Sequence, residues 1–255
     1  MKTSRLTLLV AAFAVSFAFA TAQTPAPSAK IDASAAIEKK DTTGRFRSMH
    51  DSFLARGKAG PIGVLFLGDS ITQGWTKAPH VWEHYYGKLQ PANFGIGGDQ
   101  TQHVIWRIEN GELDGINPKV VVLMLGTNNT SAHTTAEIAA ADRKIVGLIQ
   151  ARIPGAKVLV LAVFPRGARK DKEGNITATA VADAAKRMEI IRGVNAELAR
   201  LDNGGTVRFL DINAVFVGQD GKIPFAIMPD QLHPNAAGYQ LWAEAMQPTL
   251  TAMMK

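Results

Sequence analysis

The stretch V-V-V-L-M-L, from Val120 to Leu125, is apolar at every position. A strand with one face in water alternates apolar and polar residues, so an unbroken apolar run indicates a strand that is buried on both faces. A second run of this kind, V-L-V-L-A-V-F, extends from Val158 to Phe164. Parallel sheets bury both faces beneath helices, so these two runs predict the centre of a parallel sheet.

Three shorter apolar runs and a series of helical patterns extend this prediction along the chain. Further strands are expected at residues 62–67, 92–94 and 207–210. Helices are expected near residues 41–58, 81–87, 102–110, 135–152 and 177–201, and a last helix should be capped by Asn235 and end before Pro248. Alternating strands and helices predict an α/β fold, a three-layer α/β/α sandwich around a five-stranded, mostly parallel sheet.

Composition sets limits on the class of protein. The chain has 255 residues, of which 46% are hydrophobic, and this is enough to bury one large core. It has no cysteine, which excludes disulfide bonds and thiolate metal sites. The densest basic cluster, residues 166–172, contains an acid and no aromatic residue. The cluster therefore favours a solvated loop, and no nucleic-acid partner is predicted. Contact with an acidic glycan or an anionic membrane surface stays open.

The first 22 residues have the pattern of a secretory signal peptide. Lys2 and Arg5 precede an apolar stretch at residues 6–20, and the small-x-small cleavage rule is met at Ala22. The apolar stretch is short for a membrane span, so no stable membrane anchor is expected. Residues 23–40 are assigned to a linker and N-terminal segment, and residues 41–255 to the folded domain. Cleavage near Ala22 predicts a secreted or periplasmic protein, whose net charge falls from +6 to +4 because two basic residues are lost.

Polar motifs follow the first three predicted strands at the point where each strand ends. They are Gly68-Asp69-Ser70, then G-I-G-G-D at residues 95–99, and then G-T-N-N at residues 126–129. A fourth motif, D-Q-L-H, extends from Asp230 to His233 just before the last helix. Parallel sheets bind ligands at the carboxyl ends of their strands, so we expect these motifs to form one site.

The residue types in these motifs suit acyl transfer from an ester. Ser70 can act as the nucleophile, His233 as its base, and Asp230 as the carboxylate that orients the imidazole. The Ser70 backbone N–H at a helix start, the Gly98 N–H and the Asn128 amide can stabilise the oxyanion. Gly-Asp-Ser alone is also ordinary turn chemistry. The convergence of all the required roles favours the catalytic interpretation.

Other patterns in the chain carry less weight. Asp69 adjoins Ser70, but neighbours on a turn point apart, so a structural role in the loop is expected. Residues 80–84 spell H-V-W-E-H, which matches a zinc-peptidase pattern but lacks a third ligand. An amphipathic helix with surface histidines is the preferred interpretation, and neither a metal nor a cofactor is predicted. Trp106 follows the second motif at helical spacing and is assigned to core packing.

The four motifs together resemble the sequence blocks of the SGNH/GDSL hydrolases. The blocks G-D-S-I-T, N-F-G-I-G-G-D, G-T-N-N and D-Q-L-H occur in the family's order. The continuation Q-T-Q-H-V-I-W-R-I-E-N-G-E-L is similar to the catalytic-subunit type of platelet-activating-factor acetylhydrolase Ib. The resemblance implies a metal-independent enzyme with a flavodoxin-like sheet. It also implies a triad of Ser70, Asp230 and His233, with Gly98 and Asn128 completing the oxyanion hole.

By the same resemblance, Ile71 and Leu232 are expected to wall a small acyl pocket that prefers acetyl groups. The prediction is a secreted serine esterase that removes short acyl groups, with O-acetyl groups on carbohydrates as the expected substrates. Phospholipid, lysophospholipid or platelet-activating-factor-like esters are the alternative substrates. A non-catalytic carbohydrate- or lipid-binding module is the alternative of another class. The partner is thus a small-molecule or glycan ester, and the resemblance also suggests a homodimer.

Overall fold

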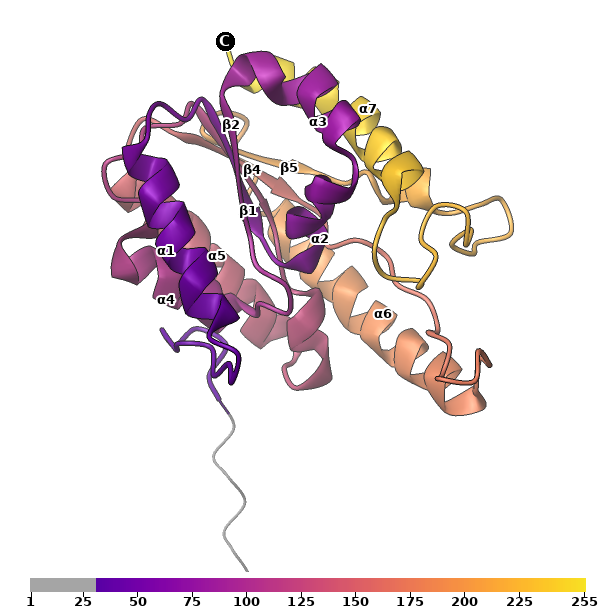
Figure 1. Cartoon of the computed structure of the whole chain (residues 1–255). Helices are drawn as coiled ribbons and strands as arrows, with labels where there is room; N and C mark the ends of the chain where they lie inside the picture. Colours follow the sequence, from indigo (N-terminus) through magenta and orange to yellow (C-terminus); the bar gives the residue numbers. More distant parts are fainter. Residues whose placement is uncertain (1–30) are drawn as a thin grey trace, which may run out of the picture. The chain divides into compact units, whose positions relative to one another are not determined.

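Five parallel strands form one sheet in the order β2-β1-β3-β4-β5, as the computed structural model of the chain shows for residues 31–255 (Figure 1). They are β1 (Val64–Gly68), β2 (Pro91–Gly95), β3 (Val120–Met124), β4 (Lys157–Leu161) and β5 (Val207–Leu210). Every neighbouring pair is parallel, which confirms the predicted sheet. Gly68 of β1 aligns with Gly95 and with Met124, so three strands end level at one edge.

Helices cover both faces of the sheet and explain the unbroken apolar runs (Figure 1). One face packs against α1 (Arg45–Lys58), α4 (Thr101–Arg107), α5 (Thr135–Arg152) and α6 (Ala178–Ala199), and the other against α2 (Ser70–Gln73), α3 (Pro79–Tyr86) and α7 (Ala236–Met253). Along β1, Leu65 and Leu67 belong to the first core, whereas Val64 and Phe66 belong to the second. Every residue of β1 and β3 is buried, as expected for strands that are covered on both faces. The three-layer α/β/α sandwich is therefore confirmed.

The central runs are slightly longer than the strands themselves. β4 ends at Leu161, although the apolar run continues to Phe164. Residues 162–164 remain buried beyond the strand, with exposed fractions of 1% or less. They connect the end of β4 to Pro165, and their apolar character reflects their burial.

The segment before α1 packs on the domain from the first described residue. Ala33 is 1% exposed and belongs to the first core. Its carbonyl accepts a hydrogen bond of 2.8 Å from the Thr101 hydroxyl at the start of α4. The compact unit accordingly extends from Ile31 to Lys255. The predicted signal peptide and residues 23–30 lie outside the described residues. In the part that is described, no helix has the length and apolar character needed to cross a membrane.

The last helix is longer than predicted. Asn235 caps it as expected, because its side chain accepts a hydrogen bond of 3.1 Å from the Gly238 N–H. The expectation that the helix ends before Pro248 is wrong, since α7 continues to Met253 with the proline inside it. A proline within a helix costs about 3 kcal/mol. Leu250 and Met253 beyond it are buried in the second core, and burying each such side chain contributes about 1.5–3 kcal/mol, enough to offset that cost.

Candidate active site

A sharp turn at the end of β1 presents Ser70. The strand ends at Gly68 and helix α2 begins at Ser70, which leaves Asp69 as its N-cap. The Asp69 carboxylate accepts a hydrogen bond of 2.9 Å from the Ile71 N–H. A Cβ atom at Gly68 would collide with the Thr72 hydroxyl, so only glycine allows the strand to lie this close to the helix. The turn leaves the Ser70 side chain half-buried at the sheet edge.

The loop before α7 presents His233 to this serine. Gln231 has a left-handed backbone with φ of 61° and is 7% exposed. Its amide nitrogen donates to the carbonyls of Ile223 and Met228, at 3.1 and 3.3 Å. These buried bonds hold the loop in a conformation that a non-glycine residue rarely adopts. The fixed loop aims the His233 ring at the end of β1.

Ser70, His233 and Asp230 form one continuous hydrogen-bonded chain. The Ser70 Oγ atom lies 2.9 Å from His233 Nε2, and His233 Nδ1 lies 2.7 Å from Asp230 Oδ2. The other Asp230 oxygen accepts from the His233 backbone N–H at 2.8 Å. The structure thus brings together three residues that lie up to 163 positions apart in the sequence. An arrangement of this kind can pass a proton from a hydroxyl to an imidazole.

The environment of Asp230 favours its ionised form. Burial raises the pKa of Asp230, but hydrogen bonds from the His233 backbone and ring and the positive charge of Arg169 outweigh it, so the pKa lies below its ordinary value. Arg169 Nη2 lies 3.1 Å from Asp230 Oδ2. An ionised carboxylate accepts the Nδ1–H of the ring. Nε2 is then left as the acceptor for the serine proton.

Two of the groups predicted to stabilise an oxyanion lie in the loops that follow β2 and β3. Gly98 has a φ of 74°, a left-handed conformation that favours glycine, and within residues 31–255 its N–H has no protein acceptor. Asn128 lies in the short turn η4 (Thr127–Ser131) after β3. Its amide nitrogen donates to the Asp99 carbonyl at 2.8 Å and to Asp69 Oδ2 at 3.3 Å. The neighbouring Asn129 is fully buried and bonds Thr101 instead.

Two buried acids lie beneath the site. Asp69 is 0% exposed, and burial raises its pKa to about 7 even though the Ile71 N–H stabilises the charged form. Burial also raises the pKa of Asp99 to about 6, against the opposing charge of Arg107, whose Nε lies 3.0 Å away. Asp69 contacts the α2 backbone and Asn128, which fits the structural role expected from the sequence. Among residues 31–255, the hydrogen bonds of the Asp69 side chain go to Ile71 and Asn128 and not to His233.

The two residues expected to wall an acyl pocket are deeply buried. Ile71 is 0% exposed and Leu232 is 6% exposed, and both belong to the second core. The Ile71 carbonyl accepts a hydrogen bond of 2.6 Å from the Tyr239 hydroxyl. Their position beside Ser70 and His233 in the chain is thus fixed by core packing. Their role towards a substrate stays a prediction.

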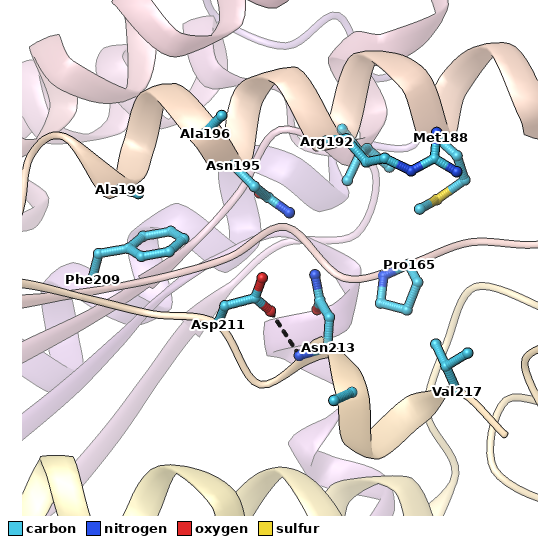
Figure 2. A pocket seen from close by; sticks show the side chains of 12 residues that line it. Pro165, Met188, Arg192, Asn195, Ala196, Ala199, Phe209, Asp211, Asn213 and Val217 are labelled. Carbon is cyan, nitrogen blue, oxygen red and sulfur yellow. Dashed lines mark hydrogen bonds between the residues drawn. The ribbon is translucent and has the colours of Figure 1, made fainter. Parts of the chain in front are cut away.

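A cavity of about 480 Å³ lies elsewhere, between α6 and the end of β5 (Figure 2). Its lining includes Met188 and Arg192 of α6, and Asp211 and Asn213 after β5. None of the triad residues lines it. The triad itself lies near the surface, where the His233 side chain is 24% exposed and that of Asp230 is 37% exposed. The hydrogen-bonded chain, and not the cavity, therefore locates the candidate active site.

Sequence reasoning missed several residues around the site. The basic cluster at 166–172 is a solvated loop only in part, because Arg166 is half-buried and Arg169 pairs with Asp230. Lys39 belongs to the segment expected to be a linker, but its ammonium group binds the Gly97 carbonyl beside Gly98. Arg166 lies two residues after the predicted strand at 158–164, and this position at a strand end could have indicated a place near the site. Lys39 carried none, since its contact spans 58 positions of the sequence.

The structure gives no functional role to the other residues that the sequence analysis considered, His80, His84 and Trp106. His80 and His84 lie exposed on α3, and no cluster of three metal-binding side chains occurs within residues 31–255. Trp106 is half-buried and packs against the first core, with the Phe46 ring centroid 5.6 Å away.

The chain matches the GDSL-like Lipase/Acylhydrolase family over residues 66–241, and it belongs to that family. It is 38% identical over 215 residues to platelet-activating factor acetylhydrolase IB subunit alpha1 of Homo sapiens, covering 83% of this chain and 85% of the relative. It is also 38% identical over 195 residues to the alpha2 subunit of Rattus norvegicus, covering 76% and 79%. These matches confirm the family resemblance, and the protein is a carboxylic ester hydrolase.

Solved structures of low sequence identity share the fold. A GDSL-like lipase from Bacteroides thetaiotaomicron superposes with a TM-score of 0.61 at 16% identity, covering 80% of this chain and 97% of that one. A member of the lipolytic G-D-S-L family from Veillonella parvula gives a TM-score of 0.53 at 18% identity, covering 74% and 97%. The flavodoxin-like SGNH hydrolase fold is therefore confirmed.

Proposed function

We propose that this protein hydrolyses short-chain esters through an acyl-enzyme formed on Ser70. The observation that carries the proposal is the unbroken chain from Ser70 Oγ through the His233 ring to the Asp230 carboxylate. Ser70 attacks the ester carbonyl while His233 Nε2 takes its proton. His233 then returns that proton to the departing alcohol. It next activates a water molecule that releases the acid, and Asp230 holds the ring in place throughout.

The oxyanion that forms in this reaction is bound by three donors. They are the backbone N–H groups of Ser70 and Gly98 and the side-chain amide of Asn128. Asn128 donates to two protein acceptors, and the longer bond, of 3.3 Å to Asp69, is the one that yields to the substrate oxygen. Removal of one such donor typically costs about 3 kcal/mol of transition-state stabilisation.

We assign acetyl esters as the preferred acyl class. The curated relatives carry the name acetylhydrolase, and this supports a small acyl group. Ile71 and Leu232 adjoin the reacting residues in the sequence, and we assign them to the wall of this acyl pocket. A panel of p-nitrophenyl esters tests the assignment, with acetate expected to react faster than decanoate. Equal or faster turnover of decanoate contradicts it.

Two alcohol classes have comparable support. The signal-peptide pattern favours an acetylated carbohydrate outside the cytoplasm, whereas the 38% identity to platelet-activating factor acetylhydrolase subunits favours an acetylated phospholipid. An acetate-release assay over both substrate classes separates them. Ser70→Ala is the control in each assay, because a non-catalytic binding module would keep its ligand affinity and never release acetate. Export and the homodimer stay predictions, which N-terminal mass analysis and light scattering test.

A further inference from the structure

Three guanidinium groups converge beside the candidate active site. Arg166 directly follows the buried end of the β4 segment, Arg169 lies in the same loop, and Arg187 lies on α6. Arg169 is paired with Asp230 at 3.1 Å, and Arg187 is paired with Asp183 on its own helix. Within residues 31–255, no carboxylate forms an ion pair with Arg166. Arg166 is thus the cation of this group without a carboxylate at ion-pair distance, although the charges of Asp183 and Asp230 act on it from further away.

The contacts of Arg166 leave much of its guanidinium unsatisfied. Its Nη1 atom lies 3.3 Å from the Thr127 hydroxyl and 3.5 Å from the Thr127 carbonyl, both near the long limit for a hydrogen bond. Its Nε atom is buried and has no hydrogen-bond partner among the described residues. Burial and the charges of Arg187 and Arg169 lower the pKa of Arg166 to about 10, against the opposing charges of Asp183 and Asp230, so it stays protonated at neutral pH. Buried charged donors are costly to leave unmatched.

The position of Arg166 connects it to the reaction. Thr127, its only side-chain partner in the described chain, immediately precedes Asn128. The next residue, Gly167, donates its N–H at 2.8 Å to the carbonyl of Gln231, between Asp230 and His233. Arg166 therefore lies between the turn that carries an oxyanion donor and the loop that carries the triad acid and base.

We propose that Arg166 is an anion subsite that binds a phosphate or carboxylate oxygen on the alcohol half of the ester. The inference rests on the proposed esterase function and deepens it by giving the substrate a negative charge. A guanidinium presents its donors in a planar fork that matches these anions. A purely structural role explains the site less well, because two long contacts to one threonine leave the buried Nε–H of Arg166 without an acceptor among the described residues.

Matched substrate pairs test the subsite. One pair is monoacetyl glycerol 3-phosphate and monoacetyl glycerol, and the other is an O-acetylated methyl galacturonoside and its neutral galactoside counterpart. The wild type should prefer the charged member of at least one pair. Arg166→Gln should lower kcat/KM for that member about tenfold more than for its neutral partner. The pair that responds identifies phosphate or carboxylate as the source of the anion.

Further variants separate this role from folding and from catalysis. Arg166→Lys keeps the charge without the fork and should recover part of the preference. Arg200→Gln is the matched control. It removes an exposed guanidinium at the end of α6 that pairs with Glu197, and it should not change the preference for the charged substrate.

An equal loss on both members of each pair, or no preference in the wild type, overturns the subsite. If Arg166→Gln does not fold, the wild-type preference and the Arg166→Lys variant decide the question. Ser70→Ala distinguishes a failed subsite from a failed function. It abolishes acetate release from every substrate if the esterase proposal holds, whether or not Arg166 selects anions.

Discussion

At the scale of single residues, the triad depends on the acceptor character of Asp230. The carboxylate accepts from the His233 ring, from the backbone N–H groups of Leu232 and His233, and from Arg169. All four bonds come from donors, so an amide, which replaces one acceptor oxygen by a donor, fits this position poorly. The hydrogen bond to the ring selects the tautomer in which Nε2 faces Ser70.

Asp230→Asn should therefore lower kcat by about 10³–10⁴-fold, because an amide donor at this position favours the wrong tautomer. The measurement is the steady-state hydrolysis of p-nitrophenyl acetate. Asp211→Asn changes an exposed carboxylate directly after β5 and serves as the control. A loss smaller than tenfold would show that the carboxylate is dispensable.

Asp142 makes a second residue-scale prediction, on stability and pH. This α5 carboxyl is 1% exposed, and neither oxygen has a hydrogen-bond partner among the described residues. Burial, and then the charge of Asp69, raise the pKa of Asp142 well above its ordinary 3.8. The folded protein thus keeps a proton that the unfolded chain loses. The free energy of unfolding falls as the pH rises from about 3.8 through the raised pKa.

Asp142→Asn should flatten this fall, since the amide is neutral at every pH and has nearly the same shape. Urea unfolding between pH 5 and pH 8 measures the effect. Asp51→Asn, at an exposed position on α1, should leave the wild-type slope in place. The same slope in Asp142→Asn and in the wild type would contradict the expected protonation.

Site residues that lie in short recognisable motifs could be predicted from the sequence. Residues whose role depends on contacts with distant parts of the sequence could not. Ser70, Asp230 and His233 were named because their types and motifs match one reaction. Arg166 was grouped with solvated neighbours, since its burial depends on Thr127 in another strand-end turn. Which of Asn128 and Asn129 faces the site was decided by the family pattern. The structure gives the reason, because Asn129 is committed to Thr101 in the interior.

At the scale of elements, the segment before α1 fastens the loop that carries Gly98. Lys39 binds the Gly97 carbonyl and lies 3.5 Å from the buried Asp99 carboxylate. The Asp99 carbonyl in turn accepts from the Asn128 amide. One lysine thus supports the loop on which two of the predicted oxyanion donors depend.

Lys39→Met should lower kcat by about ten- to a hundredfold, because small displacements of a donor are costly to catalysis. The change in KM should be smaller, which p-nitrophenyl acetate kinetics resolve. Lys40→Met removes the neighbouring exposed lysine and is the matched control. Equal effects of the two substitutions would mean that Lys39 acts only through its charge.

At the end of α7, core packing outweighs the low helix propensity of Pro248. Pro248 predicts a helix end because it lacks an N–H and crowds the preceding turn. The buried side chains on either side of it, Met246 and Leu250, hold the helix together past this position. The predicted boundary was wrong because a local rule was applied without knowledge of the surface that the helix covers.

Pro248→Ala should stabilise the protein by about 1–2 kcal/mol, since the exposed site gains a backbone hydrogen bond and loses a steric conflict. The gain is smaller than the full helix penalty of proline because the unfolded chain also becomes more flexible. Thermal unfolding followed by circular dichroism measures it. A lower melting temperature would show that the proline fits its helix without strain.

At the scale of the whole molecule, the parallel sheet is what gathers the reacting groups. Strands β1, β2 and β3 end level, and the motifs that follow them supply Ser70, Gly98 and Asn128. His233 reaches the same edge from the loop before α7. This arrangement could be predicted from the sequence, because unbroken apolar runs specify a doubly covered parallel sheet and such sheets bind ligands at one edge. The cleft shape and the alcohol it accepts depend on loop packing, which no short motif specifies.

Covalent labelling with a fluorophosphonate tests the central claim most directly, because only a serine activated by its own base reacts quickly with such a probe. Intact-mass analysis followed by peptide mapping should find one adduct, on Ser70, in the wild type and no fast labelling in His233→Ala. Rapid labelling of Ser70 in His233→Ala, or loss of activity through an adduct on a different serine, would contradict the account.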